Sequence, residues 1–201
     1  MKPLIIYCHP NHKSFTHAVK LTVLKELEQA GIDYRLTDLY ADSFNPVLDH
    51  REWQCYGQEQ YAQSLDRYIK DIQWCDTLVF IYPTWWHDLP AMLKGWFDRV
   101  LLPGVAFSLP TRAQNNVQPR LQKIVRIMVF TSCGASWCMS KLVGEPGRKI
   151  IFRGLGFLCA KPLSRTFLAH YGMDNATLAS RQCHLYRVAK KMRRQIASSN
   201  I

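Results

Sequence analysis

The sequence predicts a single α/β domain over residues 1–201, in which helices cover both faces of a doubly wound sheet of five parallel strands. Three observations lead to this prediction. Residues 77–82, Thr-Leu-Val-Phe-Ile-Tyr, form a short apolar run that is typical of a strand buried on both faces. Residues 89–101 then repeat apolar side chains at intervals of three and four, as an amphipathic helix does. The alternation of strand and helix patterns continues along the chain.

The other elements follow from the same two periodicities, taken in order. Residues 4–8 predict a first buried strand, and a helix capped by Ser14 follows it and ends near Gly31. Residues 33–39 predict an edge strand, because one of their faces is polar. The later elements are a helix at 61–74, a long loop at 102–119, a strand at 123–131, a short helix at 148–153, a last strand at 157–160 and a basic helix at 174–197.

Composition argues against several classes of protein. The formal net charge is +11 at pH 7, but much of it falls in the last helix without a recognition motif, so we expect no nucleic-acid partner. No window approaches the roughly 20 apolar residues of a transmembrane helix. The seven cysteines are odd in number and contain no Cys-x-x-Cys, which favours reduced thiols in the cytoplasm over disulfides or a metal site. The amino-terminal apolar run is too short for a signal peptide, which also favours the cytoplasm.

Three predicted loops leave the same edge of the sheet, after the first, third and fourth strands. The loop at residues 9–17 leads into a helix amino terminus, which suits an anion such as phosphate. Trp85 and Trp86 follow the third strand and form a plausible wall for a flat ligand. Small polar residues at 131–136 offer amides and hydroxyls to the polar edge of a ligand. Because ligands of open α/β sheets bind at the carboxyl ends of strands, we expect these loops to share one crevice.

Each loop also has a plainer interpretation. Ser14 could cap the helix without binding any ligand. A turn that contains Gly134 could simply end the strand. The first loop lacks the G-x-G-x-x-G pattern, so it is not a dinucleotide fingerprint of the Rossmann type. The convergence of the three loops is therefore the stronger argument for a site.

The chain resembles the flavodoxin-like NAD(P)H:quinone oxidoreductases over nearly its whole length. This group includes animal quinone reductases, bacterial modulator-of-drug-activity proteins and ancillary flavoproteins of potassium-efflux systems. The specific residues are Tyr82-Pro83 through Trp86, Leu89-Pro90-Ala91 and Lys94-Gly95-Trp96-Phe97-Asp98-Arg99-Val100, with support from His9, Ser14-Phe15, Asp38-Leu39-Tyr40, Phe44-Asn45-Pro46, Gly156-Phe157 and Pro162.

The resemblance implies a flavin, either FMN or FAD, with NAD(P)H as the co-substrate. By this resemblance the three loops bind the flavin phosphate, flank the isoalloxazine and bond its pyrimidine edge, in that order. The implied cofactor-binding residues are His9, Ser14, Phe15 and Thr16 in the first loop, Pro83, Thr84, Trp85 and Trp86 in the second, and Thr131, Ser132, Cys133 and Gly134 in the third.

The resemblance also implies a homodimer with two active sites at its interface. One protomer would then cover the other's flavin with Phe107 and Leu109. The chain departs from the animal enzymes where they place a Tyr and a His, because Met139 and Glu145 stand there. Glu145 would donate a proton near neutral pH only if burial raised its pKa by several units.

The expected activity is transfer of hydride from NAD(P)H through the flavin to a quinone or a similar acceptor. Trp86, His87 and Glu145 are the candidate catalytic residues. One alternative is a redox-sensing regulatory subunit of a potassium-efflux or other membrane transporter, with the last helix as its docking surface. Another is a flavodoxin-like carrier of single electrons. The sequence leaves open FMN or FAD, NADH or NADPH, and the physiological acceptor.

Overall fold

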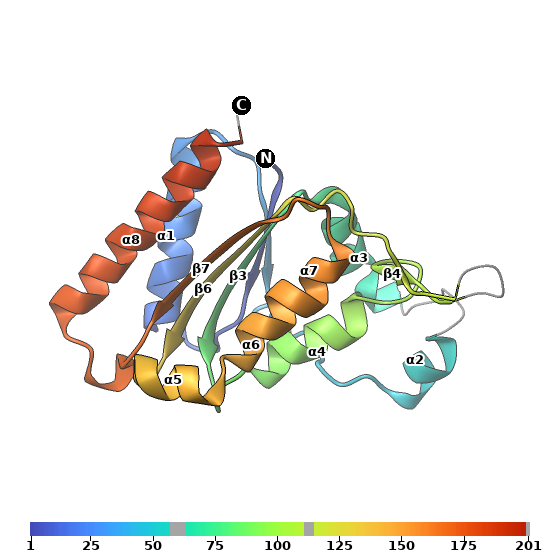
Figure 1. Cartoon of the computed structure of the whole chain (residues 1–201), viewed down its shortest axis with the longest axis horizontal. Coiled ribbons are helices and arrows are strands. Elements are labelled where there is room, and N and C mark those ends of the chain that lie inside the picture. The colour runs from blue at the N-terminus through green and yellow to red at the C-terminus, as the bar shows by residue number, and fades with distance from the viewer. Residues whose placement is uncertain (57–62, 111–114, 200–201) are drawn as a thin grey trace.

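The computed structural model describes residues 1–56, 63–110 and 115–199. Its main feature is a parallel sheet of five strands in the order β2-β1-β3-β6-β7, which confirms the predicted flavodoxin-like architecture (Figure 1). The bounds are β1 Pro3–Tyr7, β2 Arg35–Asp38, β3 Thr77–Thr84, β6 Arg126–Cys133 and β7 Ser164–His170. A separate antiparallel pair, β4 Phe107–Ser108 and β5 Gln118–Pro119, lies within the predicted long loop.

Helices cover both faces of the sheet, as Figure 1 shows. On one face lie α1 Phe15–Gln29 and α8 Leu178–Ala197; on the other lie α3 Asp66–Trp74, α4 Ala91–Val100 and the helical segment α6 Pro146–Lys149, η2 Ile150–Leu155 and α7 Gly156–Leu158. Short elements complete the described parts: α2 His50–Cys55, η1 Gln63–Leu65, α5 Trp137–Val143 and η3 Met173–Asn175. In the described ranges, no helix is long and apolar enough to cross a membrane.

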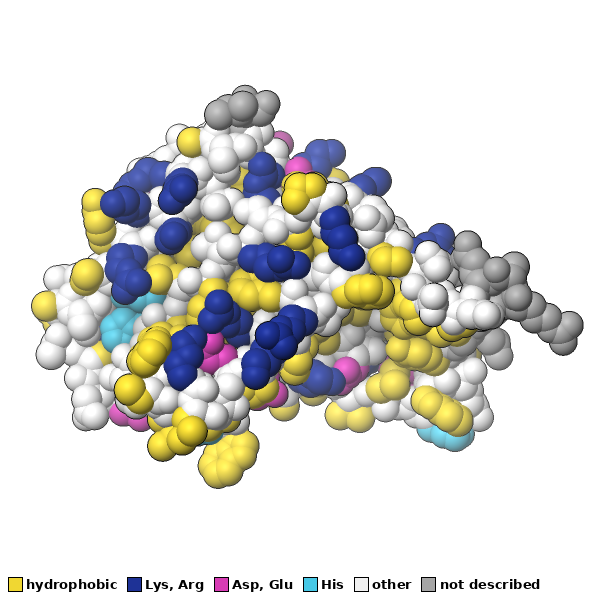
Figure 2. Space-filling view, viewed as in Figure 1, with side chains coloured by type: hydrophobic (Ala, Val, Ile, Leu, Met, Phe, Trp, Pro, Cys, Tyr) yellow, Lys and Arg dark blue, Asp and Glu magenta, His cyan; other side chains and the backbone are white. Residues whose placement is uncertain are grey.

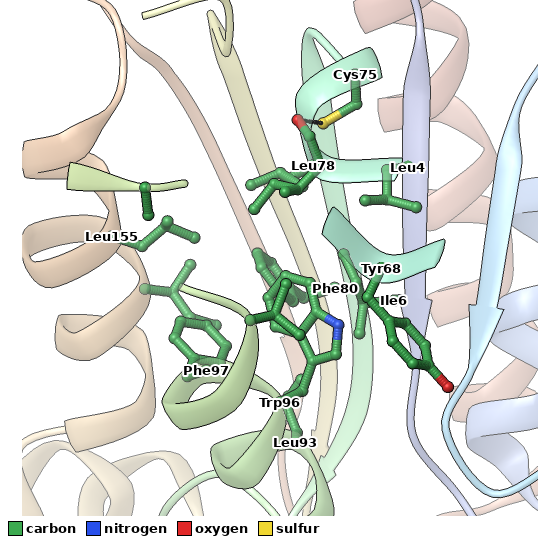
Figure 3. Close-up of a cluster of buried hydrophobic side chains, with 14 of the residues drawn as sticks. Leu4, Ile6, Tyr68, Cys75, Leu78, Phe80, Leu93, Trp96, Phe97 and Leu155 are labelled. Atoms are coloured by element: carbon green, nitrogen blue, oxygen red, sulfur yellow. Dashed lines mark hydrogen bonds between the residues drawn. The ribbon is translucent and has the colours of Figure 1, made fainter. Parts of the chain in front are cut away.

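Successive side chains along each strand point to opposite faces of the sheet, so the sheet contributes to two hydrophobic cores. Leu4 and Ile6 of β1 pack under α3 and α4, whereas Ile5 and Tyr7 pack under α1 and α8. The first core is mostly aliphatic but contains an aromatic cluster, with the Phe80 centroid 6.1 Å from that of Trp96 and 5.5 Å from that of Phe97. Figure 3 shows these rings of α4 directed at β3. The predicted central strand and helix are thus packed directly against each other.

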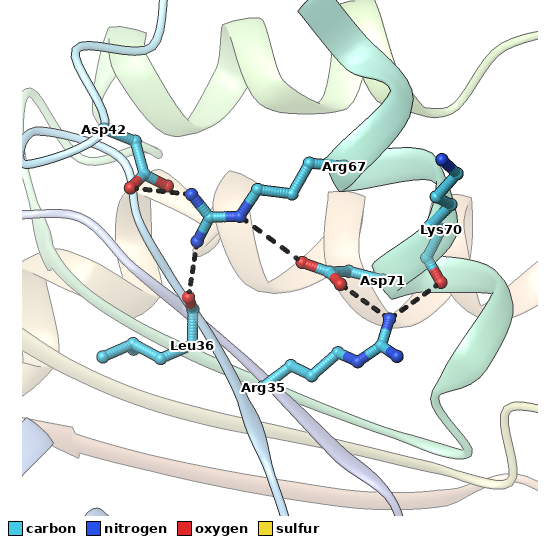
Figure 4. A network of polar contacts seen from close by, with 6 residues as sticks. All are labelled: Arg35, Leu36, Asp42, Arg67, Lys70 and Asp71. Atoms are coloured by element: carbon cyan, nitrogen blue, oxygen red, sulfur yellow. Dashed lines mark hydrogen bonds and ion pairs between the residues drawn. The ribbon is translucent and has the colours of Figure 1, made fainter.

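Charged side chains tie the edge strand β2 to α3. Arg35 donates to the Asp71 carboxylate at 2.8 Å, and Arg67 donates to Asp42 at 3.1 Å and to the Leu36 carbonyl at 3.1 Å (Figure 4). Because Arg35 and Arg67 are partly exposed, water screens these ion pairs and each adds little stability. Their role is to fix the edge strand in register.

The predicted last strand at 157–160 is wrong. Residues 156–158 form the last turn of the helical segment, and the edge strand is β7, which pairs with β6 from Arg126↔Ser164 to Ser132↔His170. The apolar run Phe157-Leu158-Cys159-Ala160 is too short for its period to distinguish helix from strand. Leu155 is buried in the first core as part of this helical segment, and Cys159, just after it, has extended backbone and forms only an isolated bridge to Leu121.

Gly95 allows α4 to lie directly against the loop before α2. A Cβ atom at this position would overlap the carbonyl oxygen and Cα of Pro46. Alanine normally stabilises a helix relative to glycine. We nevertheless expect Gly95→Ala to lower the free energy of unfolding by about 2 kcal/mol or more, because backbone must move to relieve the overlap.

The measurement is urea denaturation, with Gly154→Ala as the matched control. A Cβ atom at Gly154 meets nothing within 4 Å, so this variant should unfold near the wild-type midpoint. Equal midpoints for Gly95→Ala and the wild type would contradict the close approach of α4 to Pro46.

A second buried feature joins β7 and α8 to α1. The His184 ring lies 5.1 Å from that of His170 and 5.7 Å from that of Phe15, and only 2% of His184 is exposed. Burial, with help from His170 and Arg187, lowers the pKa of His184 from 6.5 to about 4. The fold therefore holds this imidazole neutral.

This shift predicts a loss of stability in acid. The unfolded chain binds a proton at His184 below pH 6.5, but the folded chain does so only near pH 4. The free energy of unfolding should therefore fall between these two pH values, by an amount on the order of 3 kcal/mol, and be fully present above the window. In thermal melts across this pH range, the His184→Gln variant should lose less stability toward acid than the wild type. The control His50→Gln, at an exposed histidine, should lose as much as the wild type. If His184→Gln loses stability toward acid as steeply as the wild type, His184 is not the group responsible.

Candidate functional site

Four strands bring their carboxyl ends to one edge of the sheet. The register pairs Tyr7 of β1 with Ile81 of β3, and Thr84 of β3 with Cys133 of β6. The Thr84 hydroxyl lies 3.1 Å from that of Thr131 and accepts a hydrogen bond from the Cys133 thiol at 3.2 Å. The predicted convergence of the three loops is therefore observed, and the end of β7 forms a fourth side.

The first loop presents the amino terminus of α1. Ser14 caps this helix, because its hydroxyl accepts the amide of His17 at 3.1 Å. Helix geometry leaves the amides of Phe15 and Thr16 without an intrahelical acceptor. The His17 Nδ1 atom is buried without a hydrogen-bond partner in the described structure, and the Tyr7 hydroxyl lies beside Ser14 without a bond of normal geometry. Unused donors thus gather where an anion fits.

His9 belongs to the same loop and has a defined tautomer. The Asn11 amide donates to its Nδ1 at 3.0 Å, so the proton of the neutral ring lies on Nε2. Burial lowers the pKa of His9. Its ring lies 6.0 Å from that of Trp85, which joins the first loop to the second.

The second loop is a tight hairpin with an aromatic tip. Trp85 and Asp88 exchange backbone hydrogen bonds of 3.2 and 3.0 Å, so Trp86 and His87 occupy the two corner positions. Both corners have positive φ, +48° and +64°, a conformation for which such turns normally use Asn or Gly. The Trp86 side chain is 97% exposed. Strain of this kind is maintained at functional sites, where a side chain must be presented in one direction.

The third loop begins inside β6, because the strand runs to Cys133. Thr131 and Cys133 are buried, and burial raises the pKa of the Cys133 thiol. Gly134 lies against the Asp174 carboxylate, which a Cβ atom would meet at 2.7 Å. The Gly172 amide donates to the Ala135 carbonyl at 2.9 Å, so the loop after β7 braces this one.

Glu145 lies close by, in a dense set of charges. Its carboxylate accepts hydrogen bonds from Lys141 at 2.6 Å, Arg148 at 2.9 Å and the Tyr171 hydroxyl at 2.5 Å. Burial alone would raise its pKa, but these three donors outweigh burial and lower it. Burial and the bond to Glu145 raise the pKa of Tyr171. Glu145 is therefore a fixed carboxylate, and the condition under which it could donate a proton is not met.

The structure brings most of the predicted residues together. A hollow of about 200 Å³ is lined by Thr84, Trp86, His87, Cys133 and Gly134. Pro83 is buried, and Ser132 is half-buried beside it in the β3–β6 register. Phe107 and Leu109 do not line this hollow, and Figure 1 shows β4, the strand that contains Phe107, away from the carboxyl ends of the sheet strands. The part of the chain that the structure describes contains no cluster that could hold a metal ion.

Sequence reasoning missed Tyr171, Arg148 and the buried Ser140. The reason is the misplaced last strand, since Tyr171 directly follows β7 and so belongs to the same edge as the three loops. A strand placed at 164–170 would have indicated it. A small cavity of about 20 Å³ behind the hollow is lined by Ser140, Glu145 and Arg148 together with Thr84 and His87.

Comparison with known proteins agrees with this geometry. A family described as having a flavodoxin-like fold matches residues 1–182. An uncharacterized NAD(P)H oxidoreductase of Haemophilus influenzae is 31% identical over 137 residues, which cover 68% of this chain and 66% of the relative. NAD(P)H dehydrogenase [quinone] 1 of Rattus norvegicus is 29% identical over 163 residues, 73% of this chain and 58% of the relative. The chain thus spans less than two-thirds of the length of these relatives.

A solved structure is similar over a greater length. The NAD(P)H:quinone oxidoreductase from Methanothermobacter marburgensis superposes with a TM-score of 0.80 and 28% identity, covering 96% of this chain and 98% of that one. The match over residues 1–182, the strand order and the shared architecture together confirm the resemblance seen in the sequence. This chain belongs to the family with the flavodoxin-like fold.

Proposed function

We propose that this protein is a flavin-dependent oxidoreductase that transfers hydride from NAD(P)H to a quinone or a similar acceptor. One observation carries the proposal: a helix terminus suited to an anion, an exposed aromatic hairpin and a polar strand end lie at one edge of the sheet, and the hairpin and the strand end line one hollow. A flavin has a phosphate, a flat ring and a polar pyrimidine edge, in that spatial order. The names of the relatives described above agree with this chemistry.

The residues present fit a flavin. The free amides of Phe15 and Thr16, with the partnerless Nδ1 of His17, would hold the phosphate. Trp85 and Trp86, with Pro83 and Thr84 behind them, would flank the ring. Groups of Thr131, Ser132, Cys133 and Gly134 would bond the pyrimidine edge. FMN and FAD would share the first loop through His9 and Ser14, so the geometry favours neither.

The bound flavin supplies the hydride chemistry. The protein orients the reactants, excludes water with its tryptophans and stabilises negative charge with amides near Gly134. The Cys133 thiol keeps its proton at neutral pH because its pKa is raised, so it adds no negative charge to the pocket. His87 lines both the hollow and the cavity behind it, and it is our candidate for moving a proton. Glu145 fixes Tyr171 and Arg148 instead.

We further propose a homodimer that resides in the cytoplasm. Large apolar side chains are exposed on the hairpin and on α5 beside it, with Trp86 at 97%, Leu142 at 81% and Trp137 at 56%. Such a patch favours burial against another subunit. Phe107 and Leu109 would then cover the flavin of the partner protomer, since β4, which contains Phe107, lies away from the carboxyl ends of the sheet strands (Figure 1). The oxidoreductase names of the relatives favour this enzyme over a transporter-bound regulatory subunit.

The deciding measurement is the visible spectrum of the purified, flavin-reconstituted protein under anaerobic conditions. Absorption near 450 nm should bleach on addition of NADH or NADPH and recover on addition of a benzoquinone. A flavin that stays oxidised with both nucleotides would exclude the enzyme and favour an electron carrier. A protein that retains neither FMN nor FAD would exclude the three-loop site.

The strained hairpin gives a second prediction. Replacing its corners with residues suited to positive φ, in Trp86→Asn/His87→Gly, should raise the free energy of unfolding by about 1–2 kcal/mol. The same variant should lose affinity for the flavin or the acceptor, because the aromatic wall is gone. Thermal melts and flavin titration measure the two effects, and Val47→Asn is a control for removing exposed apolar surface away from the site. A variant that is more stable and equally active would exclude both corners from the site.

A further inference from the structure

A basic groove lies beside the candidate site and has no role in the function proposed above. Its volume is about 630 Å³, and it follows the helical segment α6–α7 and the start of β7. Figure 2 shows Lys and Arg side chains gathered on this face of the molecule. The cations that line the basic groove are Arg148, Lys149, Arg153, Lys161 and Arg165, and Phe152 and Phe157 lie between them.

Most of this charge has no counterion. Glu145 lines one end of the groove, but Lys141 and Arg148 already neutralise its carboxylate. Within the described ranges, no carboxylate lies at ion-pair distance from Lys149, Arg153, Lys161 or Arg165, and all four side chains are exposed. Like charges held this close repel each other, and an anion of several charges relieves the repulsion. The basic groove is therefore suited to a polyanion.

The groove also offers an aromatic surface. Phe157 is 51% exposed, and the Lys161 ammonium lies 5.5 Å from the centroid of its ring. Exposed aromatic rings beside cations bind nucleotide bases by stacking while the cations hold the phosphates. The volume lies within the range of small-molecule sites. These features favour a nucleotide over a simple inorganic anion.

The groove adjoins the site. Glu145 and Arg148 line both the groove and the small cavity that reaches Thr84 and His87. A long ligand seated in the groove can therefore extend one end toward the proposed flavin. The nicotinamide donor has this shape, with phosphates and adenine at one end and the reacting ring at the other.

We propose that the basic groove binds the adenosine and phosphate end of the nicotinamide donor and selects NADPH over NADH. This inference rests on the proposed function. The 2′-phosphate of NADPH adds about 1.5 to 2 negative charges to those of the pyrophosphate. Four cations that lack a carboxylate partner within the described ranges match this larger charge, and the forked guanidinium groups of Arg153 and Arg165 can bind phosphate in a bidentate manner.

The kinetic test removes two of these arginines from the flavin-loaded protein. Arg153→Gln/Arg165→Gln should raise the KM for NADPH at least tenfold and the KM for NADH less. Reduced nicotinamide riboside lacks the phosphates, so its kcat/KM should not change. The control Arg187→Gln/Arg194→Gln removes the same charge from the exposed face of α8. It should leave the kinetic constants for all three donors unchanged.

A binding test separates this inference from the proposed function. Calorimetric titration with 2′-phospho-ADP-ribose needs no turnover, and we expect at least tenfold tighter binding than with ADP-ribose. The groove variant should lose this difference and the α8 control should keep it. Equal binding by the groove variant and the wild type would overturn the inference, even if NADPH reduces the flavin. Binding that depends on Arg153 and Arg165, without flavin reduction by either nucleotide, would overturn the oxidoreductase and leave a nucleotide-phosphate site.

Discussion

The packing of α4 against β3 is the constraint on which the candidate site depends. β3 leads into the tryptophan hairpin and α4 follows it, so the two elements hold both ends of the six residues 85–90. Trp96 and Phe97 lock the helix to the sheet, and Gly95 lets it approach the chain at Pro46. Arg99 anchors the far end, donating to the Glu52 carboxylate at 2.8 Å from its Nε. Only such a rigid frame can hold two non-glycine residues at positive φ.

Backbone strain coincides with the candidate site in this molecule. In the described ranges four non-glycine residues have positive φ, and Trp86, His87 and Glu145 are three of them. Each presents its side chain to the hollow or to the cavity behind it. Glu145 shows how the strain is used, because its left-handed backbone lets one carboxylate receive Lys141, Arg148 and Tyr171 together. The local balance of these groups is positive, which suits negative charge on a reduced flavin.

The sequence predicted the parts of the fold that local pattern determines. The β3–α4 unit, the Ser14 cap and the edge position of β2 have clear periodic or capping signals, and all three are confirmed. The position of β7 was missed because a four-residue apolar run fits helix and strand equally well. The roles of Glu145 and Tyr171 depend on a contact 26 residues apart in the chain, between a loop and a strand end. No local pattern determines such a contact, so only the fold reveals it.

The net charge of +11 does not by itself show where an anion would bind, because this depends on how the cations are arranged in the fold. On α8 the cations lie along an exposed helix face, where water solvates them and they need no ligand. In the basic groove the same residue types come from three short segments and surround one volume. Low-dielectric walls on several sides focus the field of such charges, which a convex helix face cannot do. The groove therefore attracts a phosphorylated ligand toward the aromatic hairpin, and the helix contributes only to the overall charge.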